Sequence, residues 1–170
     1  MDFNKYLNKG VSKHAMNLVA NEIMMHPKRL DELISIIIEN KKGSAWRAAY
    51  SLDELCSKDY SFFEKNADKL IEFVLTNPDA STQRHLCKLI SKYNIKEKHQ
   101  GEMLNFCTKS IFSDKVKVAV KVHCLEIFYN ISVIHSELKP ELELIISEVI
   151  SKNTVAFSCR AKKILKKLKK

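Results

Sequence analysis

The sequence predicts an all-α protein: a right-handed α-α superhelix of about four helix pairs, preceded by one N-terminal helix. Three observations predict this fold class. The chain has 170 residues, 45% of them hydrophobic, with only three glycines and three prolines, which suits regular helices around one core. No segment alternates polar and apolar residues between hairpin turns, so strands are not expected. A polar stripe recurs on successive predicted helices, as a stack of similar repeats requires.

The predicted helices form antiparallel pairs whose bounds follow the apolar periodicity. The pairs are 27–41 with 44–58, 62–77 with 79–94, 100–112 with 114–134, and 139–152 with 154–168. A further helix at about 12–25 precedes them. We expect a single domain over residues 1–170, in which the segment 1–26 caps the beginning and the basic helix 154–170 caps the end.

Local signals support several of these helix ends. Ser61 and Glu64 have the spacing of a capping box, and the stretch KKGS at 41–44 supplies a glycine stop followed by a serine cap. The prolines fall at or near helix starts, where a missing N–H costs nothing; they are Pro27, Pro78 and Pro140.

The stretch VAVKVHCLEIFYNIS, residues 118–132, is apolar on nearly every side of a helix. Its exceptions Ala119, His123, Glu126 and Asn130 fall on one edge, at spacings of 4, 3 and 4 residues. A helix with this pattern is buried on both flanks and exposed along one narrow strip. We therefore expect His123 to line an exposed edge, and not to act as a buried catalytic or metal-binding group.

Similar spacings pick out a polar edge on the other second helices of the pairs. These edges hold Arg47, Ser51, Glu54 and Lys58 in the first pair, Arg84, Lys88 and Ser91 in the second, and Ser158, Lys162 and Lys169 in the last. From Arg47 to Arg84, Ala119 and Ser158 the steps are 37, 35 and 39 residues. In the last helix, the remaining basic residues are expected to cover the flank that an internal repeat keeps apolar; they are Arg160, Lys163, Lys166 and Lys167.

Three stretches resemble the second helices of HEAT/armadillo-like repeat proteins: AWRAAYSLDEL, KVAVKVHCLEIFYNIS and FSCRAKKILKKL. The resemblance runs from about residue 27 to the C-terminus, and it is closest to short bacterial HEAT-repeat proteins of uncharacterised function. It implies an α-solenoid fold, with a step close to the two-helix period of such repeats. The second repeat departs from the pattern, because His85 and Cys87 stand where small apolar residues are usual. Its register stays open.

Positive charge is concentrated in the second helices of the pairs. The chain carries 29 Lys and Arg against 20 Asp and Glu, a net charge of +9. The last segment contributes basic residues without any acid: Arg160, Lys162, Lys163, Lys166, Lys167, Lys169 and Lys170. Since second helices line the concave side of such solenoids, the resemblance implies a basic concave surface.

The cysteines and histidines do not form a recognisable metal or redox motif. Five cysteines are an odd number and no C-x-x-C pair occurs, so we expect reduced thiols in a cytoplasmic protein. The pairs His85 with Cys87 and His123 with Cys124 point to different sides of a helix and cannot chelate alone. Cys87 and Cys124 are expected to be small core residues. No metal, cofactor or catalytic residue is predicted.

No segment predicts export or membrane insertion. The N-terminus lacks an apolar core segment, and no run of about 18 uncharged apolar residues occurs. The three glycines stand alone, so no phosphate-binding loop is expected. No nucleotide cofactor is therefore expected. We also expect the protein to be a monomer.

Three functions remain open. The favoured one is a non-enzymatic binding or scaffolding module that holds an acidic protein segment on a basic concave surface. The second is nucleic-acid binding through phosphate contacts. The third is an enzyme similar to the DNA alkylation-repair glycosylases, which the chain resembles in general architecture only. The expected partner-binding residues are Arg47, Ser51, Glu54, Arg84, Lys88, His123, Glu126, Asn130 and Lys162.

Overall fold

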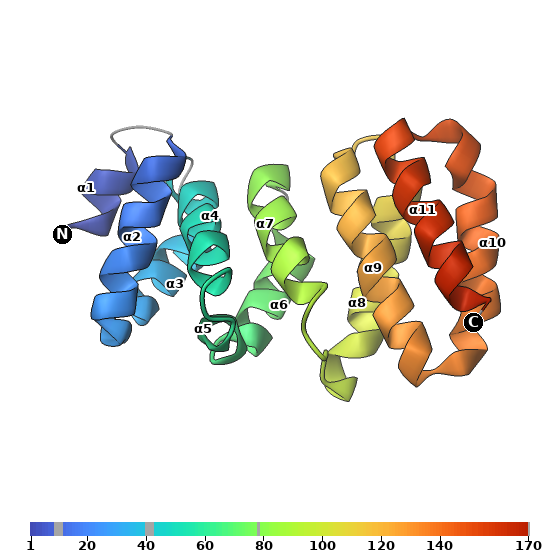
Figure 1. The fold of residues 1–170 in the computed structure, drawn as a ribbon, viewed down its shortest axis with the longest axis horizontal. Coiled ribbons are helices and arrows are strands. Elements are labelled where there is room, and N and C mark those ends of the chain that lie inside the picture. Colours follow the sequence, from blue (N-terminus) through green and yellow to red (C-terminus); the bar gives the residue numbers. More distant parts are fainter. Residues whose placement is uncertain (9–11, 40–42, 78, 170) are drawn as a thin grey trace. The chain divides into compact units, whose positions relative to one another are not determined.

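The computed structural model describes residues 1–8, 12–39, 43–77 and 79–169, and these residues form helices joined by short connections (Figure 1). No strand occurs among them. The fold is an all-α solenoid, which confirms the predicted fold class. The chain divides into two compact units, Met1–Leu89 and Ile90–Lys170, which are described separately below. The expectation of a single domain stays a prediction.

In the first unit, α4 is the central helix and packs against both α2 and α3. Its buried face carries Ala45, Ala48 and Ala49, whose small side chains allow the neighbouring helices to approach closely. The elements are α1 (Phe3–Asn8), α2 (Lys13–Met25), the 3₁₀ turn η1 (Pro27–Arg29), α3 (Leu30–Glu39), α4 (Ser44–Cys56), α5 (Ser61–Glu64), α6 (Ala67–Thr76) and α7 (Ala80–Ile90).

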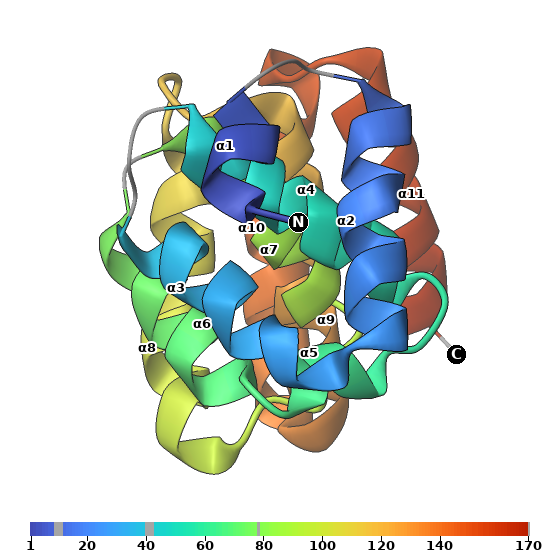
Figure 2. The ribbon, with the colours of Figure 1, turned by 90° about the vertical axis from the view of Figure 1, so that its left-hand side faces the viewer.

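The sequence did not predict α1. This short helix contacts α2, α3 and α4, and Figure 2 shows it at the N-terminal end of the unit. Phe3 and Leu7 are its buried residues, both 0% exposed. Two apolar residues four apart are too few for a periodic signal, so only their burial against α2, α3 and α4 reveals the helix. The segment before η1 thus contains two helices, where the sequence predicted one.

Two predicted caps are wrong. Gly43 is the N-cap residue of α4 with φ 93°, in the left-handed region that favours glycine, so Ser44 is the first helical residue and not the cap. The proposed capping box fails as well, because α5 ends at Glu64 and its first N–H, that of Ser61, is bound by Asp59 Oδ1 at 2.9 Å. Residues 40–42, between the end of α3 and the predicted glycine stop at Gly43, lie outside the described residues, and so does Pro78.

The predicted helix 62–77 is two helices. Asn66 leaves the helical region with φ −124° and is the N-cap of α6, a position at which asparagine is a preferred residue. Of the other prolines, Pro27 opens η1 and Pro140 lies in the first turn of α10, as predicted. In addition, Ser12 caps α2 by accepting a hydrogen bond from Ala15 N at 3.1 Å.

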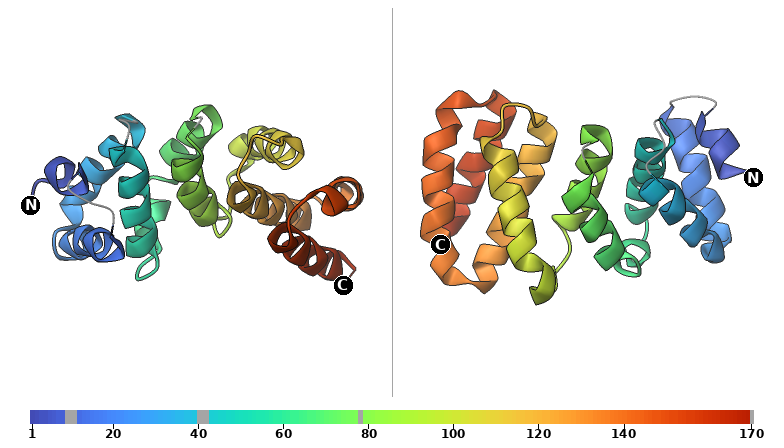
Figure 3. Two further views of the ribbon diagram at one scale, coloured as in Figure 1. Left: turned by 90° about the horizontal axis from the view of Figure 1, so that it is seen from above. Right: turned by 180° about the vertical axis from the view of Figure 1, so that it is seen from behind.

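The second unit arranges its helices in two layers, with α9 and α11 in one and α8 and α10 in the other (Figure 3). Its elements are α8 (Glu97–Phe112), α9 (Val118–Ile134), the turn η2 (Ser136–Leu138), α10 (Lys139–Val149), the turn η3 (Ile150–Lys152) and α11 (Val155–Leu168). Because α9 contacts α8, α10 and α11, it buries most of its circumference. This explains its nearly continuous apolar sequence.

The residues predicted on an exposed edge of α9 are partly exposed, and so are Val118, Val122 and Tyr129 on other sides of the helix. Ala119, His123, Glu126 and Asn130 are all half-buried, whereas Leu125 on another side is 0% exposed. His123 is therefore not a core residue.

Lys121, the one lysine within the α9 helix, is 6% exposed. Its Nζ donates a hydrogen bond to Asn153 Oδ1 at 3.2 Å, just before α11 begins. This lysine therefore serves packing and does not belong to the exposed edge.

Candidate functional site

A carboxylate of α4 binds two basic side chains of α7. Lys88 Nζ lies 2.8 Å from Asp53 Oδ2, and His85 Nδ1 lies 3.2 Å from the same oxygen. Since an ionised carboxylate only accepts hydrogen bonds, His85 must carry a proton on Nδ1. The His85 ring also stacks on Tyr50, with 4.7 Å between the ring centroids. We call Asp53, His85 and Lys88 the α4–α7 bridge.

The α4–α7 bridge encloses its carboxylate. The Asp53 side chain is 8% exposed, against 43% for Lys88. Burial alone would raise the pKa of Asp53, but the hydrogen bonds from His85 and Lys88 outweigh burial and hold this pKa below its ordinary value. A buried, ionised carboxylate with two donors on one oxygen is suited to joining two helices, and poorly suited to general base catalysis.

A second carboxylate is bound in the same way between α9 and α11. Glu126 Oε2 accepts a hydrogen bond from Arg160 at 2.8 Å, and Glu126 Oε1 accepts one from Lys167 Nζ at 2.9 Å. Burial would raise the pKa of Glu126, but the hydrogen bonds from Lys167 and Arg160 outweigh it and lower this pKa. The Lys167 ammonium also lies 4.7 Å from the ring centroid of Tyr129. We call Glu126, Arg160 and Lys167 the α9–α11 bridge.

The α9–α11 bridge corrects one prediction. Arg160 and Lys167 were expected on the uncovered flank of the last helix, but they face α9, the second helix of the preceding pair. The reason is that Glu126 offers them a half-buried carboxylate, which a helix considered alone cannot reveal.

Four other lysines, on α11 or at its C-cap, are exposed and have no ion-pair partner among the described residues: Lys162, Lys163, Lys166 and Lys169. We call these four the lysine surface. Three of them, with the half-buried Leu165, line a shallow hollow of about 310 Å³. Unlike Arg160 and Lys167, the lysines of this surface keep their positive charge available for a ligand.

The residues predicted on the polar edge of α4 differ in their exposure to solvent. Ser51 is 0% exposed, and its hydroxyl lies 3.0 Å from Arg47 O and 3.4 Å from Met16 Sδ, either of which can accept its hydrogen bond, so its predicted exposure is wrong. It is buried because α2 covers that side of α4. Arg47 is half-buried, with its guanidinium 5.2 Å from the Trp46 ring centroid, and Glu54 is half-buried too.

The remaining predicted residues lie on three helices. Arg84 is exposed on α7 and Lys162 is exposed on α11. Lys88 and Glu126 are engaged in the two bridges. Asn130 donates a hydrogen bond from Nδ2 to Ser91 O at 2.7 Å. Within each unit, the structure thus places some of these residues at exposed positions and engages others in contacts between helices.

The sequence analysis missed two features. It did not pair Asp53 with His85 and Lys88, although the separations of 32 and 35 residues are close to the repeat length and could have suggested the contact. It also missed a pocket beside α9, described below, whose isoleucines at positions 127, 131 and 134 follow helical spacing.

Cys87 and Cys124 are both 0% exposed, which confirms their predicted place in the core. Among the described residues, no three His, Cys, Asp or Glu side chains gather where a metal ion could be held. None of the described helices combines the length and the apolar character needed to cross a membrane.

Comparison with known proteins identifies the repeat type. A family model described as a HEAT repeat domain matches residues 3–168, which is nearly the whole chain. No curated protein and no solved structure matches the chain significantly. HEAT repeats generally mediate protein–protein scaffolding. Together with the stacked helix pairs, this match establishes that the chain belongs to the HEAT-repeat family.

Proposed function

We propose that the protein is a non-enzymatic scaffold that binds an acidic protein segment, with the lysine surface of α11 as a principal contact. The family supports protein binding in general. The observation that carries the finer proposal is the environment of Leu165. This half-buried leucine shares its hollow with Lys162, Lys166 and Lys169, none of which is neutralised by a described acid.

The combination of an apolar side chain with unpaired lysines favours a protein ligand. An apolar residue among cations suits a segment that alternates carboxylates with apolar side chains, because both kinds of contact are then used. A nucleic-acid backbone would use the lysines and leave Leu165 without a matching group. In the first unit, the exposed Arg84 of α7 would also favour an acidic partner.

The test measures binding by fluorescence anisotropy with two labelled probes. One is a short peptide in which Glu and Asp alternate with Leu, and the other is single-stranded DNA of random sequence. The test variant is Lys162→Glu/Lys166→Glu/Lys169→Glu. Its matched control is Lys109→Glu/Lys115→Glu/Lys117→Glu, which changes the net charge equally at exposed positions outside the lysine surface.

We expect the peptide to bind and the test variant to weaken it about tenfold or more, while the control variant changes the affinity much less. Equal losses of peptide affinity in both variants would mean that only the overall charge of the protein matters, and would contradict the proposal. Nucleic-acid binding is the second candidate, because the same unpaired lysines attract phosphates. It would replace the first if DNA bound more tightly than the peptide, with a log–log salt slope of about 0.7 per phosphate contact.

A further inference from the structure

The connection between α7 and α8 is held in place at both ends by amide side chains. Asn130 of α9 binds the carbonyl of Ser91 as described above, and Gln100 Nε2 of α8 donates to the carbonyl of Ile95 at 2.8 Å. Gln100 Oε1 lies 2.7 Å from His135 Nε2 at the end of α9, so that nitrogen must carry a proton and donate. The backbone of 91–95 is therefore fixed relative to both helices.

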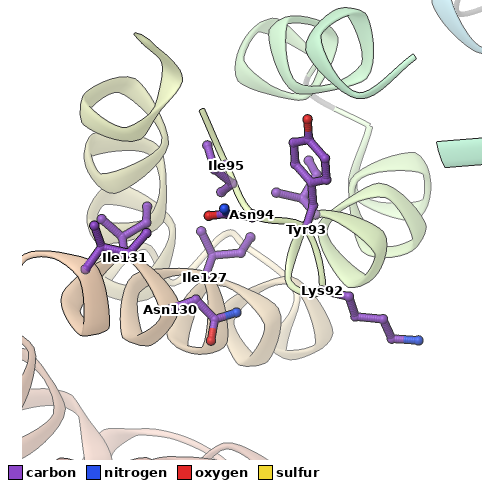
Figure 4. Close-up of a pocket in the computed structure, with 9 residues that line it drawn as sticks. Lys92, Tyr93, Asn94, Ile95, Ile127, Asn130 and Ile131 are labelled. Carbon is purple, nitrogen blue, oxygen red and sulfur yellow. The ribbon is translucent and has the colours of Figure 1, made fainter. Parts of the chain in front are cut away.

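Between this connection and α9 lies a pocket of about 250 Å³ (Figure 4). Ile127 and Ile131 extend from α9 toward Ile95 on the connection, and these three side chains are buried. Ile134, which is 55% exposed, lies at the mouth. We call this cavity the isoleucine pocket.

The size of the pocket limits its ligand. Apolar cavities of about 150 Å³ hold a benzene molecule, and sites for drug-sized ligands begin at about 300 Å³. The isoleucine pocket lies between these limits, so it matches a single aliphatic or aromatic side chain. Because the connection is tied down at both ends, little conformational entropy is lost when the pocket is filled.

The polar groups around the pocket favour an anionic partner. Lys92 is exposed and is the one charged residue in the lining, which contains no acid. Asn94 is also exposed, and the Asn130 amide uses its N–H on Ser91 O, which leaves its oxygen to accept a hydrogen bond from a ligand. The lining thus offers an apolar floor, one cation and two amides.

We propose that the isoleucine pocket binds one apolar side chain of an acidic protein segment, and that a carboxylate next to this side chain pairs with Lys92. The inference rests on the proposed function, since it states how the same kind of partner is recognised at a second place in the unit. A nucleic acid has no aliphatic side chain to fill the floor, and a purely apolar segment would not use Lys92.

The experiment follows the isoleucine methyl signals of the full-length protein by NMR during peptide titrations. Three peptides of equal length are used: an acidic peptide with one central Leu, the same peptide with Ala in that place, and the Leu peptide with Asn and Gln in place of its acids. We expect the acidic Leu peptide to shift the signals of Ile95, Ile127 and Ile131. The Ala peptide should bind about tenfold more weakly, as expected for loss of a buried side chain.

Two variants and their controls locate the contact. Ile134→Ser should weaken the acidic Leu peptide severalfold, whereas Val133→Ser should not, although Val133 is equally exposed at 56% and adjacent on the same helix. Lys92→Glu should weaken the acidic Leu peptide but not the neutral one. Lys115→Glu, at an exposed lysine outside the pocket lining, is its control.

The two proposals fail in distinguishable ways. Acidic peptides that bind without shifting the pocket methyl signals would overturn the inference and leave the proposed function standing. The inference is also overturned if the Leu and Ala peptides bind equally well. If none of the peptides binds but 4-phenylbutyrate shifts the pocket signals, the occupant is a small carboxylate, and both the inference and the acidic-segment proposal are wrong.

Discussion

The α4–α7 bridge and the α9–α11 bridge each join two second helices of one unit through a carboxylate, but the two carboxylates are buried to different degrees. In each, a carboxylate of one second helix accepts hydrogen bonds from two basic side chains of the next second helix. Asp53 is 8% exposed and Glu126 is 17% exposed. The basic partners differ more, because His85 is 13% exposed while Arg160 and Lys167 are 41% and 48% exposed.

The difference in burial determines how much each bridge should contribute to the stability of the fold. A carboxylate in a low-dielectric site interacts more strongly with its partners and loses more when they are removed. The α4–α7 bridge should therefore contribute more to stability than the α9–α11 bridge, whose partners are hydrated. In both bridges the basic groups are already neutralised, so they are weaker candidates for partner contact than the lysine surface.

Two substitutions in α9 give reference values of the unfolding free energy for this comparison. Leu125→Ala removes a side chain that is 0% exposed and should cost about 2–5 kcal/mol of unfolding free energy. His123→Ala on the half-buried edge should cost less than about 1 kcal/mol. Urea denaturation of the full-length protein measures both, and equal losses would mean that the edge is packed as tightly as the core.

The larger bridge effect is expected at Asp53. Asp53→Ala should cost about 1.5–3 kcal/mol, because it removes a buried carboxylate that accepts two hydrogen bonds from basic groups. Glu54→Ala, next to it on α4 but without a place in the bridge, serves as the control in the same denaturation series. A loss no greater than that of the control would show that burial of Asp53 cancels its contacts.

A smaller effect is expected at Glu126. Glu126→Ala should cost about 0.5–1 kcal/mol, since its partners are largely hydrated and exposed ion pairs contribute little. Adding salt should reduce the difference between this variant and the wild type more than it does for Asp53→Ala, because exposed charges are better screened. A cost above that of Asp53→Ala would reverse the comparison.

The smallest effect is the pH dependence of the α4–α7 bridge. The pKa of Asp53 is lower in the folded protein than its ordinary value of 3.8, so its stabilisation is present above that pH and is lost as the pH falls through the folded-state pKa. The difference in unfolding free energy between wild type and Asp53→Asn should therefore shrink from about pH 7 to about pH 3. Glu54→Gln is the control, and a difference that grows on acidification would contradict the sign.

The sequence predicted the helices well where apolar residues recur over several turns. The polar residues of α9 from His123 to Asn130 were placed on one edge because the rest of that helix, apart from Lys121 and Ser132, is apolar. The same argument failed at Ser51, because a serine facing a neighbouring helix has the same place in the spacing as one facing solvent. It also failed at Ser61 and Glu64, where a nearby aspartate provides the cap.

By itself, the sequence determined that this protein is an all-helical repeat with a basic last helix, since periodicity and composition are local properties of the chain. Only the tertiary structure decided which charges remain available. It paired Glu126 with Arg160 and Lys167, left the lysine surface without partners among the described residues, and opened the isoleucine pocket between α9 and the α7–α8 connection. These outcomes depend on which side chains of successive helices meet, and that geometry is set by packing between segments far apart in the sequence.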